Sequence, residues 1–507
     1  MEKNKTQQNT VTRAPVVVVM GHIDHGKSTL LDYIRKSNVV DTETGGITQK
    51  ISAYEVIHKD EKGVDQKITF IDTPGHEAFS KMRERGAQIA DIAILIVSAE
   101  DGVKPQTIEA WKTIVNSGLP AIVAINKIDR PGANVEKTKT ELAENEIYLE
   151  NYGGTIPFVE ISAKEGTGID GLLSLILIIA EMESFIGDKN AEASGYVIEA
   201  NLDPKRGIEG TLIIKNGSVK NGMTVVVEDS ICSTRIMENF LGKMVKEATF
   251  SSPIRIVGFN KIPQVGGEFK TFLKKGDAEK YALSWKEDST SLVSKKETDQ
   301  TNKKLIPIML KADVAGSLEA IEKEIAKIKS KAEEQNAEFK IISKGVGGIT
   351  LSDIKSLSTD GDILIIGFNV TADRSAVEEA ERRGVEISTF NIIYKMTEWL
   401  EEQMERLRPK IETVEVTGRA KIIRAFSRTK ERQVVGGKVA EGTISLNSTV
   451  KIVRRDFEIG KGKIVNLEKS KVKTSMVEEG TEFGMMIESK IEIASGDVLE
   501  AFSVTQK

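Results

Sequence analysis

The feature that most constrains the fold is the stretch VVVVMGHIDHGKSTLLDYIRK at residues 16–36, where an apolar run, a glycine-rich loop and a helical pattern follow one another. It places Gly21, Gly26, Lys27 and Ser28 at the spacing G-x-x-x-x-G-K-S/T. Glycines let backbone N–H groups face a phosphate at a helix N-terminus, the lysine brings positive charge to the terminal phosphates, and the hydroxyl can bind Mg²⁺. We therefore expect a nucleoside triphosphate site in this loop.

Short β-branched runs continue to alternate with helical stretches as far as about residue 183. The runs are VVVVM, KITFID, IAILIVSA, PAIVAINK and PFVEISA. This alternation is typical of βαβ units around a parallel sheet. We expect residues 15–186 to form one α/β nucleotide-binding domain, with a polar tail at residues 1–14.

The 507 residues are too many for a single core, and the patterns change several times after this domain. Short strands between Gly and Asn turns predict barrels, and a helical apolar spacing that ends near Pro409 predicts a helix. The fold class is therefore α/β and multidomain. In chain order we expect an antiparallel β-barrel at 193–283, a polar linker or exposed helix at 284–304, a second α/β domain at 305–392, a connecting helix at 393–410 and a C-terminal β-barrel at 411–507.

The stretch ITFIDTPGHEAF at residues 68–79 predicts the γ-phosphate side of the site. Asp72 ends an apolar strand and is placed to bind Mg²⁺ directly or through water, and Gly75 can donate its amide to the γ-phosphate. His76 can then orient the attacking water or, if protonated, stabilise developing charge; a histidine that caps the following helix is the alternative. No catalytic role is assigned to His22, His25 or His58.

The NKID motif predicts the base that is bound. Asn126 and Asp129 follow the buried run PAIVAI, at the carboxyl end of a parallel strand, where α/β ligands bind. A carboxylate there can accept both N1–H and the exocyclic N–H of guanine, whereas adenine lacks this pair of donors. Ser162, Ala163 and Lys164, after PFVEI, form the last element of the base site. We therefore expect GTP and GDP, with Mg²⁺, as ligands.

Composition excludes several classes of protein. No apolar run reaches the roughly 18 residues of a membrane span, and the single cysteine, Cys232, excludes a disulfide framework. The N-terminal residues lack signal- and transit-peptide features, so we expect a cytoplasmic protein that contacts no membrane. The net charge is −5, yet residues 419–473 hold fifteen lysines and arginines against five acidic residues. This stretch is either a solvated face or a contact for nucleic-acid phosphates.

Taken together, GHIDHGKSTLLD, GGITQKISAY, DTPGHEAF, NKID and SAKEGTGI resemble the translational GTPases. DTPGHEAF with GGITQ is similar to bacterial translation initiation factor two in particular. The likeness continues through GYVIEANLDPKRGIEG, KADVAGSLEAI, GKIVNLEKSK and EFGMMIES, and covers residues 15 to 502 without the long N-terminal extension common in that family.

The resemblance implies roles for further residues. Thr48 closes onto Mg²⁺ and the γ-phosphate, Ile23 and Ile47 flank His76 as an apolar gate, and Asp24 helps to bind a monovalent cation. The expected nucleotide-binding set is Asp24, His25, Gly26, Lys27, Ser28, Thr29, Thr48, Asp72, Gly75, Asn126, Lys127, Asp129, Ser162, Ala163 and Lys164, with Ser28, Thr48 and Asp72 as metal ligands and His76 as the catalytic residue.

The resemblance also implies that the terminal barrel binds the formylmethionyl end of initiator tRNA. The expected contacts are Arg424, Arg428, Lys430, Phe483 and Gly484. The chain differs here from the usual family pattern, because Phe483 stands where a cysteine is usual and Arg432 lies in an altered glycine segment. Lys50 likewise replaces a usual histidine.

The implied function is GTP-dependent translation initiation. The factor would bind initiator tRNA and the small ribosomal subunit, promote joining of the large subunit, work with other initiation factors, hydrolyse GTP on the ribosome and be a monomer away from it. Two alternatives remain open: an elongation-type factor that carries any aminoacyl-tRNA, and a ribosome-binding assembly scaffold that uses GTP without hydrolysing it.

Overall fold

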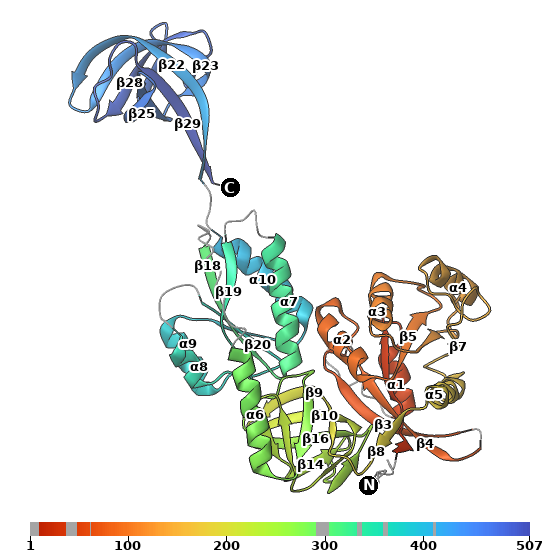
Figure 1. The fold of residues 1–507 in the computed structure, drawn as a ribbon. Coiled ribbons are helices and arrows are strands. Elements are labelled where there is room, and N and C mark those ends of the chain that lie inside the picture. Colours follow the sequence, from red (N-terminus) through yellow and green to blue (C-terminus); the bar gives the residue numbers. More distant parts are fainter. Residues whose placement is uncertain are drawn as a thin grey trace, which may run out of the picture. The chain divides into compact units, whose positions relative to one another are not determined.

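The computed structural model describes residues 10–36, 48–60, 62–290, 304–331, 337–357, 363–408 and 412–506. They form two compact units, which divide between Leu407 and Arg408 (Figure 1). Among these residues, no helix is long and apolar enough to cross a membrane.

The first domain is built on a six-stranded sheet. Every residue of the central strands β2 and β5 is buried, as expected where helices cover both faces. β3 pairs with β4 antiparallel, and the other neighbours pair in parallel. The order is β3 (Ser52–Lys59), β4 (Asp65–Asp72), β2 (Val16–Gly21), β5 (Ile92–Ser98), β6 (Ala121–Asn126) and β7 (Phe158–Glu160).

Two layers of helices enclose this sheet. Leu30 and Ile176 pack with Val17 on one face, and Met82 and Leu142 belong to the core on the other face. Because β2, β4 and β6 run in the same direction, their carboxyl ends lie at one edge of the sheet, where the ligands of such sheets bind. The helices are α1 (Lys27–Arg35) and α5 (Ile169–Glu183) on the first face, and α2 (Ser80–Ile89), α3 (Pro105–Asn116) and α4 (Val135–Glu144) on the second. A short 3₁₀ helix, η3 (Glu77–Phe79), precedes α2, and β1 (Thr10–Thr12) pairs with β8 (Ile186–Asp188).

A curled antiparallel sheet of barrel type follows. Its core includes Cys232, whose burial raises the pKa of the thiol to about 12, so the thiol is packed rather than reactive. The order is β13 (Ser230–Ser233), β12 (Thr224–Val227), β17 (Glu268–Phe272), β9 (Ser194–Asp203), β10 (Gly207–Asn216), β16 (Pro253–Phe259) and β14 (Ile236–Asn239), with β11 (Ser218–Lys220) and β15 (Glu247–Thr249) as a separate pair.

Helix α6 (Lys275–Thr290) extends past the predicted start of the linker at residue 284. Ala278 and Ala282 pack against Val226 of the barrel, so the helix is fixed by burial that its polar composition does not reveal. The boundary predicted between residues 283 and 284 falls inside this helix. Residues 291–303 lie outside the described part of the chain.

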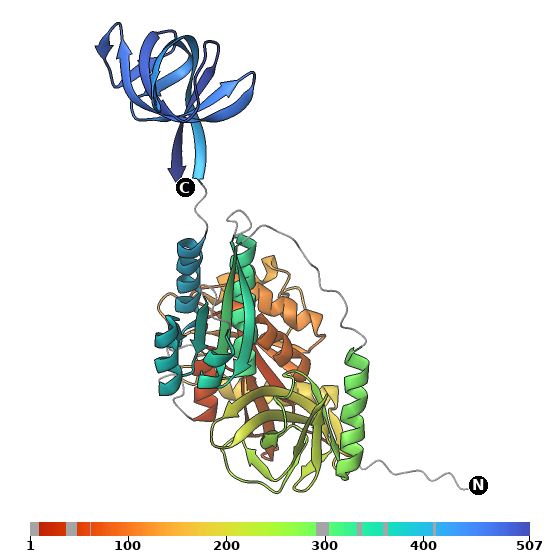
Figure 2. The ribbon, with the colours of Figure 1, turned by 90° about the vertical axis from the view of Figure 1, so that its left-hand side faces the viewer.

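The second α/β domain has a four-stranded parallel sheet covered on both faces (Figure 2). Helices α7 and α10 share one core with the sheet, and α8 and α9 share the other. The strand order is β19 (Ala337–Val346), β18 (Lys304–Ala312), β20 (Leu364–Phe368) and β21 (Ile387–Phe390), and the helices are α7 (Ala315–Lys331), α8 (Leu351–Ser356), α9 (Arg374–Arg383) and α10 (Ile393–Leu407).

Helix α10 occupies most of the predicted connecting helix at 393–410. Its apolar residues Ile393, Met396, Leu400 and Met404 are all nearly inaccessible and pack in the core of the second α/β domain. The helix is therefore a structural layer of that domain. Residues 409 and 410 lie outside the described part of the chain.

The unit that begins at Arg408 is a closed barrel. Six antiparallel strands follow one another around it, and the pairing of β22 with β23 completes the circle. The order is β22 (Glu412–Thr429), β29 (Val498–Gln506), β24 (Thr449–Arg454), β25 (Phe457–Lys469), β28 (Glu482–Ser489) and β23 (Arg432–Ser445), with β26 (Val472–Lys473) beside β25 and β27 (Met476–Glu478) beside β23. The order α/β, barrel, α/β and barrel, with α10 as part of the second α/β domain, confirms the predicted multidomain fold class.

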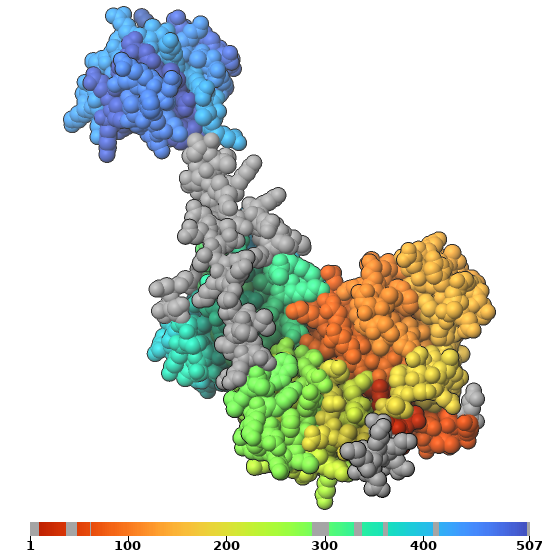
Figure 3. Space-filling model, viewed as in Figure 1, coloured from red at the N-terminus to blue at the C-terminus, as the bar shows by residue number. Residues whose placement is uncertain are grey.

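The two α/β domains meet along α7, as the contact between the orange and blue-green surfaces in Figure 3 shows. Arg85 of α2 pairs with Glu319 of α7 at 2.6 Å. Lys323 of α7 donates to the backbone oxygen of Glu77 at 3.0 Å and to Ser80 Oγ at 2.6 Å. The second α/β domain therefore contacts the chain directly after the predicted catalytic histidine.

Candidate functional site

The glycine-rich loop joins β2 to α1 and passes very close to two other strands. Gly21 has a positive φ of 148°, and a Cβ there would lie 2.4 Å from the backbone oxygen of Ile96. Gly26 has a φ of 90°, and a Cβ there would lie 2.3 Å from Asn126 Nδ2. Only glycine fits both the conformation and the space. The loop is therefore held against β5 and against the NKID segment.

Lys27 is buried below this loop. Its Nζ donates to the backbone oxygens of Gly21 at 3.0 Å and of His22 at 2.5 Å. Burial lowers the pKa of Lys27 to about 8, and the Asp72 carboxylate opposes this change. An anionic ligand beside Lys27 would favour the charged form of this buried amine, which agrees with the phosphate contact that the motif predicts.

The loop that carries Gly75 and His76 lies beside the phosphate loop. A Cβ on Gly75 would lie 2.5 Å from Lys27 Nζ and 3.3 Å from Ile23 Cγ1. The backbone at Gly75 can therefore approach a phosphate held by Lys27. Ile23, one side of the implied gate, lies next to this loop, whereas Ile47 lies outside the described residues.

The hydroxyl groups of Ser28 and Thr48 meet across the site. Their Oγ and Oγ1 atoms are 2.9 Å apart, although 20 positions separate the residues. Asp72 is buried at the end of β4 and close enough to Lys27 to influence its pKa. Two hydroxyls and a carboxylate are hard oxygen donors, which suit Mg²⁺.

On the base side, Asn126 connects two loops. Its Nδ2 donates to the backbone oxygen of His25 at 2.8 Å, and its Oδ1 accepts from the backbone nitrogen of Ala163 at 2.9 Å. Ser162 Oγ donates to Asp129 Oδ1 at 2.7 Å, and this hydrogen bond lowers the pKa of the exposed carboxyl. Asp129 is therefore an oriented, ionised acceptor.

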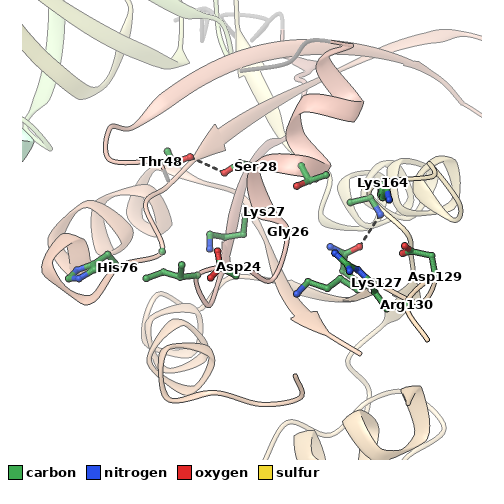
Figure 4. Close-up of a pocket in the computed structure, with 15 residues that line it drawn as sticks. Asp24, Gly26, Lys27, Ser28, Thr48, His76, Lys127, Asp129, Arg130 and Lys164 are labelled. Carbon is green, nitrogen blue, oxygen red and sulfur yellow. Dashed lines mark hydrogen bonds between the residues drawn. The ribbon is translucent and has the colours of Figure 1, made fainter. Parts of the chain in front are cut away.

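These residues surround a cavity of about 410 Å³ (Figure 4). Most of the predicted set borders it, from the phosphate loop to the loop after β7. Arg130 also borders the cavity. It was not predicted, because its position directly after NKID is the only sequence signal that points to it. The lining residues are Ile23, Asp24, Gly26, Lys27, Ser28, Thr29, Thr48, Gly75, His76, Asn126, Lys127, Asp129, Arg130, Ala163 and Lys164.

Three predicted residues do not line the cavity. His25 is buried, with Nδ1 3.4 Å from the backbone oxygen of Ile96, and burial lowers its pKa to about 3. It contributes its backbone oxygen, which accepts from Asn126. Ser162 orients Asp129 from behind, and Asp72 lies below Lys27 at the strand end. His25 and Ser162 therefore support residues that line the cavity, His25 through its backbone oxygen and Ser162 through its hydroxyl.

His76 caps the helix that follows it, which is the alternative that the sequence left open. Its Nδ1 accepts from the backbone nitrogen of Ala78 at 2.9 Å, and its ring lies 4.3 Å from the Tyr394 ring between centroids. Burial lowers the pKa of the imidazole, so the neutral form is favoured. The ring nevertheless borders the cavity, so the capping contact and a place in the site coexist.

The predicted tRNA contacts lie at several places in the terminal barrel. Arg424 is exposed, and its guanidinium lies 5.6 Å from the centre of the Phe426 ring, which is 49% exposed. Arg428 donates to backbone oxygens, including that of Lys430 in the β22–β23 turn. Phe483 is only 5% exposed and packs in the barrel core, because β28 directs alternate residues inward. The sequence missed the exposed aromatic Phe426.

Comparisons with known proteins agree with the fold and the cavity. The family model of the elongation factor Tu GTP binding domain matches residues 12–182, that of translation-initiation factor 2 matches residues 282–401, and that of elongation factor G domain 2 matches residues 192–272. A GTPase domain is therefore present where the cavity lies.

Two similar relatives carry the same name. Translation initiation factor IF-2 of Bacillus cereus (strain G9842) is 40% identical over 99% of this chain and 73% of its own length. That of Anoxybacillus flavithermus (strain DSM 21510 / WK1) is 40% identical over 98% of this chain and 69% of its own length.

Two solved structures show a weaker likeness. GDP-bound aIF5B from Aeropyrum pernix is 25% identical, covering 97% of this chain and 92% of its own, with a TM-score of 0.45. The bacterial selenocysteine-specific elongation factor EF-Sec is 26% identical, covering 51% and 45%, with a TM-score of 0.41.

The identity to the bacterial relatives extends over nearly the whole chain, which confirms the resemblance found in the motifs. It also favours initiation over the elongation-type alternative. The chain belongs to the translation initiation factor IF-2 family and is a GTPase, a hydrolase that acts on GTP.

Proposed function

We propose that this chain binds formylmethionyl initiator tRNA and the small ribosomal subunit, promotes joining of the large subunit and hydrolyses GTP on the ribosome, in the cytoplasm and together with other initiation factors. The observation that supports this most directly is the cavity in which the phosphate loop, Thr48, His76 and the NKID residues meet. The nucleotide contacts, the tRNA contacts and the partners all belong to this proposal.

The base side of the cavity selects guanine. Ser162 holds the Asp129 carboxylate so that its oxygens can accept N1–H and the exocyclic N–H of the base. Adenine would leave this charge without donors, which is costly where water is displaced. Asn126 keeps the base loop and the phosphate loop at a fixed separation, because it hydrogen-bonds to both.

The phosphate side fits a triphosphate with Mg²⁺. Ser28, Thr48 and Asp72 would hold the metal, which neutralises charge on the phosphate oxygens when bound. Asp24, which lines the cavity, is the residue proposed for a monovalent cation. Lys27 leaves its contacts with Gly21 and His22 to bind phosphate oxygens instead.

His76 is proposed to orient the attacking water. Because the Ala78 N–H donates to Nδ1, the neutral ring carries its proton on Nε2. In this capped orientation Nε2–H is a donor, which can hold the oxygen of a water but cannot take its proton; a ring that turns toward the phosphate gives up the Ala78 hydrogen bond. The ring therefore positions the nucleophile, and hydrolysis depends on placing it correctly against the γ-phosphate.

The test replaces His76 in the full chain. His76→Ala should keep GTP affinity but lower ribosome-stimulated hydrolysis by at least about a hundredfold, the usual size of such an effect. His76→Asn retains a side-chain acceptor for the helix cap and should lose the stimulation equally. His58→Ala, on β3 and outside the cavity, is the histidine control. Normal turnover in His76→Asn would reduce His76 to a helix cap.

The terminal barrel is proposed to bind the tRNA end. Arg424 and exposed Phe426 together offer a cation and an aromatic face, which suit phosphate and an unstacked base. Of the remaining expected contacts, Arg428 lies on β22, Lys430 in the β22–β23 turn, and Phe483 and Gly484 on β28. Filter binding of formylmethionyl against methionyl initiator tRNA is the measurement. Equal binding would favour an elongation-type factor.

A further inference from the structure

The second α/β domain contacts both chain segments that border the γ-phosphate side of the cavity. At the first segment, Gln49 Nε2 donates to the backbone oxygen of Asn391 at 3.0 Å, and Lys50 pairs with Asp313 at 2.5 Å. At the second, Lys327 pairs with Glu77 at 2.9 Å, beside the Lys323 contacts already described. One domain therefore restrains the segment after Thr48 and the segment after His76 together.

One further contact of the second α/β domain involves His76 itself and joins two aromatic rings. Tyr394, in the first turn of α10, meets the His76 imidazole edge-on, with 4.3 Å between centroids and 71° between the planes. No hydrogen bond from the Tyr394 hydroxyl is found among the described residues, so the contact depends on the ring. The Phe79 ring also meets the His76 ring edge-on, with 6.0 Å between centroids.

His76 is also fixed through its backbone and its ring nitrogen. Arg83 Nη1 donates to the backbone oxygens of Pro74 at 3.2 Å and of His76 at 2.5 Å, and Ala78 donates to Nδ1. Figure 4 shows the imidazole directed away from Lys27. To hold a water at a phosphate bound by Lys27, the ring must turn, and turning separates it from Tyr394.

We propose that Tyr394 is a positioning residue for GTP hydrolysis, whose ring holds His76 turned away from the phosphate until the second α/β domain moves. This inference rests on the proposed role of His76 in orienting water. The domain then couples its own displacement to catalysis, because the ring that holds His76 belongs to α10, whose buried face packs in that domain. A ligand that moves α10 shifts the population toward the competent ring orientation.

The test measures single-turnover GTP hydrolysis by the full chain without ribosomes. Tyr394→Ala should raise the rate constant by about threefold to tenfold, the range that the loss of one aromatic pair allows. GTP affinity should stay within about twofold, since Tyr394 does not line the cavity. Tyr394→Phe keeps the ring and should behave as the unmodified chain. Tyr148→Ala is the control, because both tyrosines are 46% exposed.

A double variant and a spectrum make the result specific. His76→Ala with Tyr394→Ala should abolish the gain, because the gain acts through the imidazole. In a ¹H–¹³C spectrum of the four histidines, Tyr394→Ala should shift the His76 ring signal, whereas Tyr148→Ala should not. If Tyr394→Ala does not fold, Tyr394→Leu preserves apolar volume and replaces it.

An unchanged or lower rate in a folded Tyr394→Ala or Tyr394→Leu chain would overturn the inference. If His76→Ala leaves ribosome-stimulated turnover intact, the proposed role of His76 fails whatever Tyr394 does. If His76→Ala abolishes that turnover and removal of Tyr394 has no effect, only the present inference fails.

Discussion

At the scale of single residues, the site combines groups whose usual behaviour is changed by burial. Lys27 is the clearest example, because burial lowers its pKa to about 8 while neighbouring carboxylates favour its charged form. Asp129 is the opposite case, an exposed carboxyl whose pKa is lowered chiefly by the hydrogen bond from one hydroxyl. The buried amine suits an anionic phosphate and the oriented carboxylate suits the N–H groups of guanine, and each of these matches has a measurable consequence.

The first consequence concerns pH. The lowered pKa means that Lys27 loses its proton as pH rises through about 8, and a bound triphosphate should raise that pKa again. GTP binding should therefore take up protons at pH 9 and little at pH 7, and affinity should fall above pH 8. Titration calorimetry in two buffers of different ionisation enthalpy measures the uptake. Lys27→Arg stays charged and should show none; equal uptake in both proteins would contradict the prediction.

The second consequence concerns the base. Asp129→Asn replaces one acceptor oxygen by an amide donor, so it should weaken GTP binding and favour xanthosine triphosphate, whose base has an oxygen where guanine has an amino group. A loss of about 2 kcal/mol or more is expected for an unpaired buried donor. Competition binding with the two nucleotides measures it. Asp65→Asn, at an exposed carboxylate that begins β4 outside the cavity, is the control and should leave both affinities unchanged.

At the scale of elements, helix α2 supports the catalytic loop. Arg83 is almost fully buried, donates to the backbone oxygens of Pro74 and His76, and pairs with Glu109 of α3 at 2.5 Å. A single side chain thereby links α2, α3 and the loop. Its removal leaves one buried and one partly buried carbonyl group without this donor.

Arg83→Ala should therefore destabilise the first domain by about 2–4 kcal/mol. It should also lower ribosome-stimulated hydrolysis, because the loop that carries His76 loses its backbone donor. Urea unfolding and single-turnover kinetics are the measurements. Lys81→Ala, on an exposed face of the same helix, is the control and should change neither. Equal stability of the two variants would show that the Arg83 contacts are dispensable.

The same helix shows where sequence reasoning stops. Asn126 was predictable at the cavity edge, and Asp72 at a buried strand end, because motif spacing and the end of a parallel strand place them there. Arg83 was not, because SKMRERGAQI is a polar helical pattern whose buried partners come from another segment. Tyr394 contacts His76 although more than 300 positions separate them in the chain, and no local sequence pattern predicts such a contact. Phe483 was expected in a binding surface, whereas the inward alternation of β28 buries it.

At the scale of the whole molecule, the two units have separate cores. Among the residues that the structure describes, the apolar core of the terminal barrel consists of residues from Ala420 to Ala501 and their partly buried neighbours in the same unit. The six strands close on themselves, so this unit needs no strand from elsewhere in the described chain. A closed barrel with its own core can unfold as one cooperative unit.

Calorimetry of the full chain should accordingly show two unfolding transitions. GTP with Mg²⁺ should raise the midpoint temperature of one transition only, because a ligand stabilises the unit that binds it. At a ligand concentration one hundred times the dissociation constant, the free energy of unfolding of that unit should rise by about 2.7 kcal/mol. The unaffected transition should have the midpoint of an isolated fragment of residues 408–507. Ile464→Ala, in the barrel core, should lower that transition alone, whereas Ile94→Ala should lower the other. A single transition shifted as a whole by GTP would show that the two cores unfold together.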